Sequence, residues 1–302
     1  MFESPPRPSN PPDLGALVER APWLKIGPPA LLLCVTLVVL YAPILQDLGR
    51  QWWDDANYQH GFLVPIVSAF LIWRRRGVLQ GIAPHGSTWL GVPVLLLGIG
   101  MLLGGDIGAE NFLMRSSLII VLAGLVLFIL GPHLLRAVLF PLAFLFFMVP
   151  LPAIVFYAIT FPLQRMAAEQ AAWILDLLGV PVLLDGNIIH LSQISLGVTE
   201  ACSGIRSLIS LMAGAITWAY LLGPSRWTML FFAVATVPIT IIANAGRVVA
   251  TGLIGQWFGV EYASGFFHEL AGWVVYMFAF LCLVALHALL RLAGRLRREV
   301  RA

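Results

Sequence analysis

Long apolar stretches, separated by short polar segments, fill most of the chain after residue 27. A membrane-spanning helix needs about 20 mostly apolar residues, and eight stretches approach or reach that length. They are residues 28–45, 58–73, 88–105, 112–131, 137–157, 205–222, 228–250 and 269–290. The second stretch is the weakest, because its uninterrupted apolar part, Gly61 to Trp73, has 13 residues. The pattern predicts an all-α polytopic membrane protein with about eight transmembrane helices.

The basic residues predict how these helices are oriented. If the N-terminus is cytoplasmic, 13 of the 18 lysine and arginine residues fall in segments on the inner side. Such a bias is typical of cytoplasmic loops, so both termini are expected inside. The outer segments are then 46–57, 106–111, 158–204 and 251–268. The five remaining basic residues, Arg50, Arg115, Arg165, Arg206 and Arg247, lie outside or at outer helix ends.

The long outer segment has a pattern of its own. Residues 160–178 combine apolar residues at helical spacing with Arg165, Glu169 and Asp176, which predicts an amphipathic helix on the membrane surface. The apolar positions at helical spacing are Leu163, Met166, Ala167, Trp173, Ile174 and Leu177. Asp185-Gly186 between two β-prone runs predicts a small hairpin before the sixth span. No second soluble domain is expected. The domain prediction is a disordered cytoplasmic tail (1–27), a transmembrane domain (28–290) and a basic cytoplasmic tail (291–302).

Composition supports the membrane class and excludes several functions. Hydrophobic residues make up 60% of the chain and charged residues 11%, whereas soluble domains carry about 25% charged residues. The net charge of +3 reflects inner loops and does not indicate nucleic-acid binding; the expected surroundings are a lipid bilayer. Cys34 and Cys282 lie inside apolar runs, so a disulfide framework is not expected. No metal-ligand spacing or phosphate loop occurs, and no cofactor or metal is predicted.

A polar island, residues 198–208, stands out against this background. It contains Cys202 with Ser203 and Gly204, just before the apolar run that starts at Ile205. A cysteine at a helix N-terminus is favoured as a thiolate by the free amides and the positive end of the helix dipole. Arg206 would add positive charge, and Glu200 is the acidic member of the island. The alternative interpretation is a small buried cysteine at a helix start.

Two further polar residues are expected on the same side of the membrane. Arg247 lies near the outer end of the seventh span, and a charge at that depth is a functional candidate; the alternative is an arginine that snorkels to the interface. Asn244, three residues earlier, shares its helix face. His268 begins the eighth span and suits proton transfer, although a single interfacial histidine has no function in many proteins. Together with Cys202, they match a cysteine acyl-transfer site.

Four sequence blocks resemble the signature blocks of the exosortase family. They are V-T-E-A-C-S-G-I-R-S-L at 198–208, N-A-G-R-V at 244–248, H-E-L-A-G-W at 268–273 and W-D-D-A-N-Y-Q-H-G-F-L-V-P at 53–65. The resemblance covers residues 30–290 and includes the eight-helix plan. It implies a bacterial inner-membrane cysteine enzyme, similar in role to sortases but unrelated in fold. Related archaeal enzymes have arginine at the third position, where this chain has His268, so the bacterial branch fits better.

The resemblance also implies the roles of the residues and the partners. Cys202 would be the nucleophile, Arg247 a stabiliser of the oxyanion or thiolate, and His268 the general acid or base. The substrates would be exported proteins with a C-terminal Pro-Glu-Pro motif, a transmembrane helix and a basic tail. Cleavage at the periplasmic face would give a thioester, which an amine acceptor or water would resolve, in a process linked to exopolysaccharide and surface-protein sorting.

The early block and two rival functions complete the sequence-based hypotheses. Asp55, Tyr58 and His60 are candidates for shaping the site or binding substrate, with a structural cap for the second span as the alternative. One rival function is a non-catalytic membrane subunit of exopolysaccharide assembly or export. The other is a membrane acyltransferase that uses His268 as its base.

Overall fold

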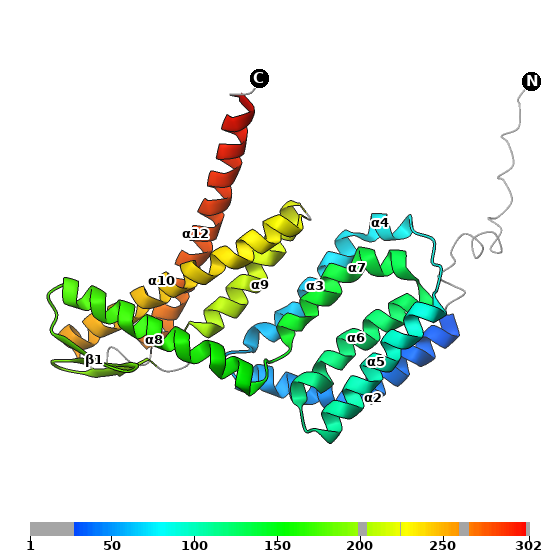
Figure 1. Cartoon of the computed structure of the whole chain (residues 1–302), viewed down its shortest axis with the longest axis horizontal. Coiled ribbons are helices and arrows are strands. Elements are labelled where there is room, and N and C mark those ends of the chain that lie inside the picture. Colours follow the sequence, from blue (N-terminus) through cyan, green and yellow to red (C-terminus); the bar gives the residue numbers. More distant parts are fainter. Residues whose placement is uncertain (1–26, 199–203, 224, 260–265, 300–302) are drawn as a thin grey trace, which may run out of the picture. The chain divides into compact units, whose positions relative to one another are not determined.

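The computed structural model describes residues 27–198, 204–223, 225–259 and 266–299 (Figure 1). The chain divides into two compact units. Unit 1 comprises Met1–Gln51 and Val67–Phe146, and unit 2 comprises Trp52–Ile66 and Phe147–Ala302. The early block that resembles the family signature therefore belongs to the same unit as Arg247.

Unit 1 is built from helices. They are α2 (Gly27–Asp54, which ends inside unit 2), α3 (Leu63–Arg74, which begins there), α4 (Arg76–Gln80), α5 (Thr88–Ile107), α6 (Asn111–Ile129) and α7 (Pro132–Phe144), followed by the 3₁₀ turn η3 (Leu145–Met148). The side chains of Ser87 and Glu110 accept hydrogen bonds at the starts of α5 and α6, as expected for N-caps.

Helices α5 and α6 pack closely because glycine recurs every seven residues on α5. A Cβ atom at Gly91, Gly98 or Gly105 would lie 2.6–2.7 Å from atoms of α6. Small residues of this kind let membrane helices approach each other where no hydrophobic driving force exists.

A buried arginine on α6 is accommodated by polar neighbours within unit 1. Arg115 is 7% exposed, and its Nη1 donates to Oε1 of Gln51 on α2. Two residues further along α6, the hydroxyl of Ser117 bonds to that of Tyr41 at 2.8 Å. Polar contacts of this type link α2 to α6, since an unpaired polar group in the membrane interior is costly.

Unit 2 contains the remaining elements. They are the 3₁₀ turn η2 (Gln59–Phe62), α8 (Ala153–Leu177), β1 (Val182–Asp185), β2 (Ile188–Leu191), β3 (Ser195–Gly197), α9 (Ile205–Leu222), α10 (Arg226–Phe258) and α12 (Phe266–Glu299). Helix α9 packs on α10 and α12, and α8 packs on α10 (Figure 1).

The all-α polytopic fold is confirmed, whereas the count of eight spans stays a prediction. Within the described residues, five helices are long and apolar enough to cross a membrane, namely α5, α6, α9, α10 and the part of α12 from Gly272 to Leu292. A sixth results if α7 and α8 form one broken span. Helix α3 has 12 residues, about 18 Å, which is short for a hydrocarbon core of about 30 Å.

The predicted continuous span at 137–157 is wrong in its boundaries. Helix α7 ends at Phe144, and a new helix begins only at Ala153. Pro150 and Pro152 explain the break, because proline lacks the amide donor and disfavours helical geometry in the preceding residue. The predicted surface helix at 160–178 is accordingly the later part of a helix that starts at Ala153.

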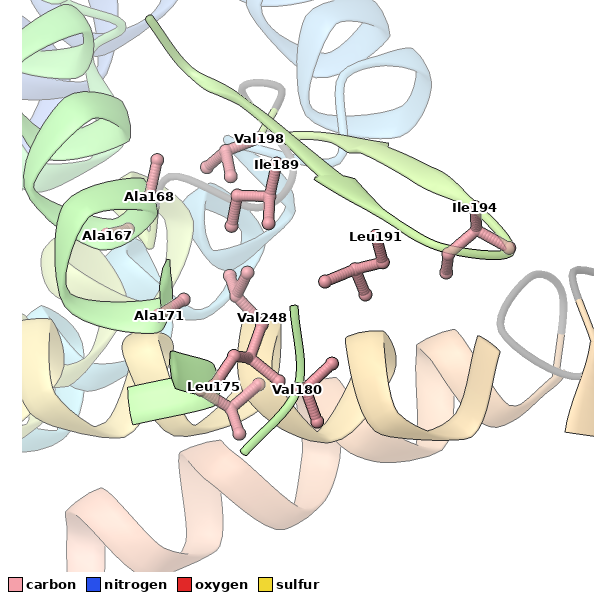
Figure 2. Close-up of a cluster of buried hydrophobic side chains, with 11 residues drawn as sticks. Ala167, Ala168, Ala171, Leu175, Val180, Ile189, Leu191, Ile194, Val198 and Val248 are labelled. Carbon is pink, nitrogen blue, oxygen red and sulfur yellow. The ribbon is translucent and has the colours of Figure 1, made fainter. Parts of the chain in front are cut away.

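Helix α8 buries small residues within the protein and leaves some of its large apolar residues exposed. Its fully buried residues include Ala168, Ala171 and Leu175, whereas Trp173 and Leu177 are 64% and 65% exposed. Small residues lie against the sheet and α10, as Figure 2 shows for Ala167, Ala168 and Ala171. The small side chains let α8 approach the sheet and α10 closely. Its placement on the membrane surface stays a prediction.

The predicted hairpin is confirmed and gains a third strand. The strands form an antiparallel sheet of order β1-β2-β3. The turn residues are Gly186 and Asn187, and Gly186 has φ +60°, as a type II′ turn requires at its first central position. Ile189, Leu191 and Val198 point from the sheet region toward Val248 of α10 (Figure 2). The sheet is thereby fixed to the helix that carries Arg247.

The alanine face of α8 predicts a strong size dependence. Ala171→Leu adds three carbon atoms where the side chain is fully buried, and overpacking should destabilise the protein by about 1–3 kcal/mol. Thermal unfolding in detergent measures this. Met166→Leu, at a position on the same helix that is 40% exposed, is the control and should leave the unfolding temperature unchanged. Equal unfolding temperatures for both variants would contradict the packing described here.

Candidate functional site

Helix α9 begins at a tightly constrained glycine two residues after Cys202. Gly204 precedes the helix with φ +78° and ψ 1°, in the left-handed region, and its carbonyl accepts the amide of Leu208 at 2.8 Å. Left-handed geometry is costly for residues with a Cβ atom. The start of α9 thus lies within the 198–208 block, shortly after Cys202 in the sequence.

Asn244 of α10 lies against this glycine. A Cβ atom at Gly204 would be 3.1 Å from Cγ of Asn244, and Asn244 is 3% exposed. The space that a side chain would fill at residue 204 is thus occupied by a buried amide. This contact brings the middle of α10 to the start of α9.

Arg247 connects the Gly204–Asn244 contact to α12. The four residues Gly204, Asn244, Arg247 and Gly272 are called the contact line below. Arg247 is half-buried and lies three residues after Asn244, on the same side of α10. Its guanidinium carbon is 3.9 Å from the position of a Cβ atom at Gly272 of α12. At this distance an added Cβ would be in ordinary van der Waals contact with the guanidinium, so Arg247 lies beside α12 at Gly272. Residue 268 is four positions before Gly272, so both positions share one face of α12.

The side chains of Ser210 on α9 and Tyr276 on α12 lie near each other further along both helices. The Ser210 hydroxyl donates to the carbonyl of Arg206 at 2.8 Å. Tyr276 is four residues beyond Gly272 on the same face of α12. Gly272, Ser210 and Tyr276 were not predicted as part of the site. For Gly272 and Tyr276 the signal in the sequence is their spacing of four and eight residues from His268.

Several predicted site residues lie beyond what the structure describes. Glu200, Cys202 and Ser203 are outside the described residues, as is the side chain of His268, whose backbone belongs to α12. The structure therefore brings together Gly204, Asn244, Arg247 and the start of α12. The Arg206 side chain is exposed, on the opposite side of α9 from the buried Ile205 and Leu208.

The early block forms a compact turn docked on residues 147–156. Trp52 donates from Nε1 to the carbonyl of Met148 at 2.9 Å, and its ring meets that of Phe62 edge-on with 5.1 Å between centroids. Gly61 lies under the indole, since a Cβ atom there would be 2.3 Å from Nε1 of Trp52. The ring of the buried Tyr58 contacts Phe156, with centroids 6.2 Å apart. These contacts support a structural role for the block.

Asp55 and His60 also serve this turn. An Asp55 carboxylate oxygen accepts the amide of Asn57 at 2.9 Å, and the Asp55 carbonyl accepts the amide of Tyr58. His60 Nε2 is 3.1 Å from the carbonyl of Phe147. Burial in this turn lowers the pKa of His60, and hydrogen bonds to the backbone of Phe147 and Asn57 partly offset the shift. The imidazole is therefore favoured in its neutral form.

Metal ligation has no support in the described part of the chain, where no group of three or more histidine, cysteine or acidic residues is clustered. Cys282 is a free, half-buried thiol on α12. His190, on β2, contacts the hydroxyl of Ser195 at 2.8 Å at the surface of the sheet.

The sequence matches the family model of the transmembrane exosortases over residues 52–285. This match covers well over half of the chain and includes the early block, the sheet and all the elements of the contact line. The chain therefore belongs to the transmembrane exosortase family, as its sequence blocks indicated. Neither a curated protein nor a solved structure matches it.

The Gly204–Asn244 contact predicts the effect of adding one methyl group. Gly204→Ala combines a left-handed residue with a 3.1 Å approach to Asn244 and should destabilise the protein by about 1–2 kcal/mol. Gly214→Ala on the same helix is the control, since nothing lies within 4 Å of its added Cβ, and should be neutral or stabilising. Thermal unfolding of both variants in detergent checks this; equal stability would contradict the contact.

Proposed function

We propose that the protein is a membrane-embedded cysteine peptidase and transpeptidase that processes the C-terminal sorting signal of exported proteins. The observation that carries the proposal is the contact line from Gly204 through Asn244 and Arg247 to Gly272. It joins the helix that follows Cys202, the helix that carries Arg247 and the helix that carries His268. Membership of the exosortase family supports the same conclusion.

The proposed reaction starts with the Cys202 thiolate, which the N-terminus of α9 favours. Its sulfur attacks the carbonyl carbon of the scissile peptide bond, and the carbonyl electrons move onto oxygen. The proposed donors to that oxyanion are backbone amides at the start of α9 and the guanidinium of Arg247. Arg247 is suited to this task because its charge is held at all physiological pH values.

Collapse of the tetrahedral intermediate breaks the carbon–nitrogen bond and forms a thioester on Cys202. The leaving amine takes a proton from His268, which is the proposed general acid. His268 then accepts a proton from the incoming amine or water that attacks the thioester. The substrate class is a protein with a Pro-Glu-Pro motif, a transmembrane helix and a basic tail, and the proposed location is the periplasmic face of the bacterial inner membrane.

Loss of the nucleophile tests the mechanism most simply. Co-expression of the protein with a tagged substrate that carries the three-part tail should give cleavage, which Cys202→Ala abolishes while the protein accumulates normally. Immunoblotting of the substrate measures the outcome. Continued cleavage in Cys202→Ala would exclude the thioester mechanism and favour the acyltransferase alternative. Full function of the Cys202, Arg247 and His268 alanine variants would favour the non-catalytic subunit.

Arg247 should contribute to rate more than to substrate affinity. Removing an oxyanion donor costs about 10²–10³ in kcat, so Arg247→Ala should fall in that range, and Arg247→Lys should recover only part of the loss because lysine lacks the planar fork. Arg165→Ala is the control, since Arg165 pairs with Glu169 at 2.8 Å on the exposed face of α8. Initial rates across substrate concentrations separate kcat from KM; a change confined to KM would contradict the proposed role.

A further inference from the structure

We propose that the outer edge of β3 binds an extended segment of the substrate protein as an added strand and leads it to the site. The inference rests on the proposed function and names the surface that receives the substrate backbone. Strand β3 is the last described element before the Cys202 block, and Gly197 precedes Cys202 by five residues.

The register of the sheet shows which backbone groups of β3 face outward. The amide of Val198 donates to the carbonyl of Asn187, and the amide of Leu191 donates to that of Ile194, each at 2.8 Å. Leu196 opposes Ile189 midway between these two bonded pairs. In antiparallel sheets bonded and non-bonded pairs alternate, so Leu196 bonds toward β2. Ser195 and Gly197 therefore direct their N–H and C=O groups to the other edge.

That edge has the properties of a peptide-binding strand. In the described part of the chain β2 is the one sheet neighbour of β3. Ser195 and Gly197 are exposed, and nothing lies within 4 Å of a Cβ atom built on Gly197. Edge strands are commonly protected by charged side chains or proline, and the segment Ser195–Gly197 has neither. The outward N–H and C=O groups of Ser195 and Gly197 can pair with the backbone of an extended peptide, which presents the same groups at every second residue.

Helix α10 connects this edge to the contact line described above. On α10, Gly252 lies under β3, because Cδ1 of Leu196 is 3.3 Å from a Cβ position there, and Asn244 lies under Gly204. The two positions are two helical turns apart on one face, about 12 Å along the axis. An extended chain covers about 3.3 Å per residue. A segment paired with β3 would thus reach the level of Gly204 after about four residues.

The chemistry of the motif indicates which part of the substrate pairs. A strand that pairs with Ser195 and Gly197 must donate backbone amides from two of its residues, at positions i and i+2. The two prolines of Pro-Glu-Pro have no amide hydrogen, so the motif itself cannot supply both donors. The paired segment is therefore a flanking stretch, about four residues from the scissile bond.

A variant pair at one position tests the enzyme side. Gly197→Pro removes an outward donor but no bond to β2, whereas Gly197→Ala keeps the donor and adds a methyl group in open space. Loss of one hydrogen bond should raise the KM for the tagged substrate about three- to tenfold in Gly197→Pro, with Gly197→Ala unchanged. Equal KM values for the two variants would overturn the proposal. A Gly197→Pro change in oligomeric state by light scattering, with KM unaltered, would assign the edge to a second copy and also overturn it.

The substrate side provides a test that leaves the protein intact. Synthetic peptides carrying the Pro-Glu-Pro motif with flanking residues are made with single backbone esters, each replacing one amide. Their affinity for the Cys202→Ala variant should fall three- to tenfold at alternate flanking residues and stay constant at the residues between. An equal response at all positions would overturn strand addition. If Cys202→Ala itself cleaves the parent substrate, the proposed function fails instead, so the two failures are distinguishable.

Discussion

The close approach of Asn244 to Gly204 is the constraint on which the candidate site depends. It requires a residue without a side chain in left-handed geometry at the start of α9, and a buried amide on α10 to fill the space. Once these two helices are in register, Arg247 lies one turn further along α10, against Gly272. The tight contact between Gly204 and Asn244 thus fixes α10 against the start of α9, and Arg247 lies beside α12 at Gly272.

The helical class followed directly from the apolar stretches, and the hairpin from Asp185-Gly186. Features that depend on how the elements pack could not be predicted from the sequence. The broken helix at Pro150 and Pro152 is hidden inside an apolar run that reads as one span. On α8 the face that packs on the sheet is rich in alanine, while Trp173 is exposed, and the sequence does not show which apolar residues contact the rest of the protein. Strand β3 is too short, with one core-facing residue, for alternation to reveal it.

The chemistry of the candidate site stays a prediction from the sequence, whereas part of its architecture comes from the structure. Cysteine, arginine and histidine stood out because polar residues at the ends of apolar helices are costly, and the family blocks gave them roles. Asn244 was expected to share a face with Arg247, and it does. The contact of Asn244 with Gly204 and that of Arg247 with Gly272 depend on how the helices pack, which spacing along one helix does not specify. The early block was expected near the site or as a cap, and its described contacts are those of a structural turn.

The central claim is that the contact line brings residues 202 and 268 together. Disulfide formation between Cys202 and His268→Cys, with Cys34→Ala and Cys282→Ala removing the other thiols, tests it most directly, because a disulfide requires Cα atoms within about 7 Å. Oxidation in native membranes should give an intramolecular disulfide. His287→Cys on the same helix is the negative control, since it lies 19 residues further along α12, about 28 Å away. Failure of the 202–268 pair to form a disulfide, or equal formation by the control, would contradict a shared site.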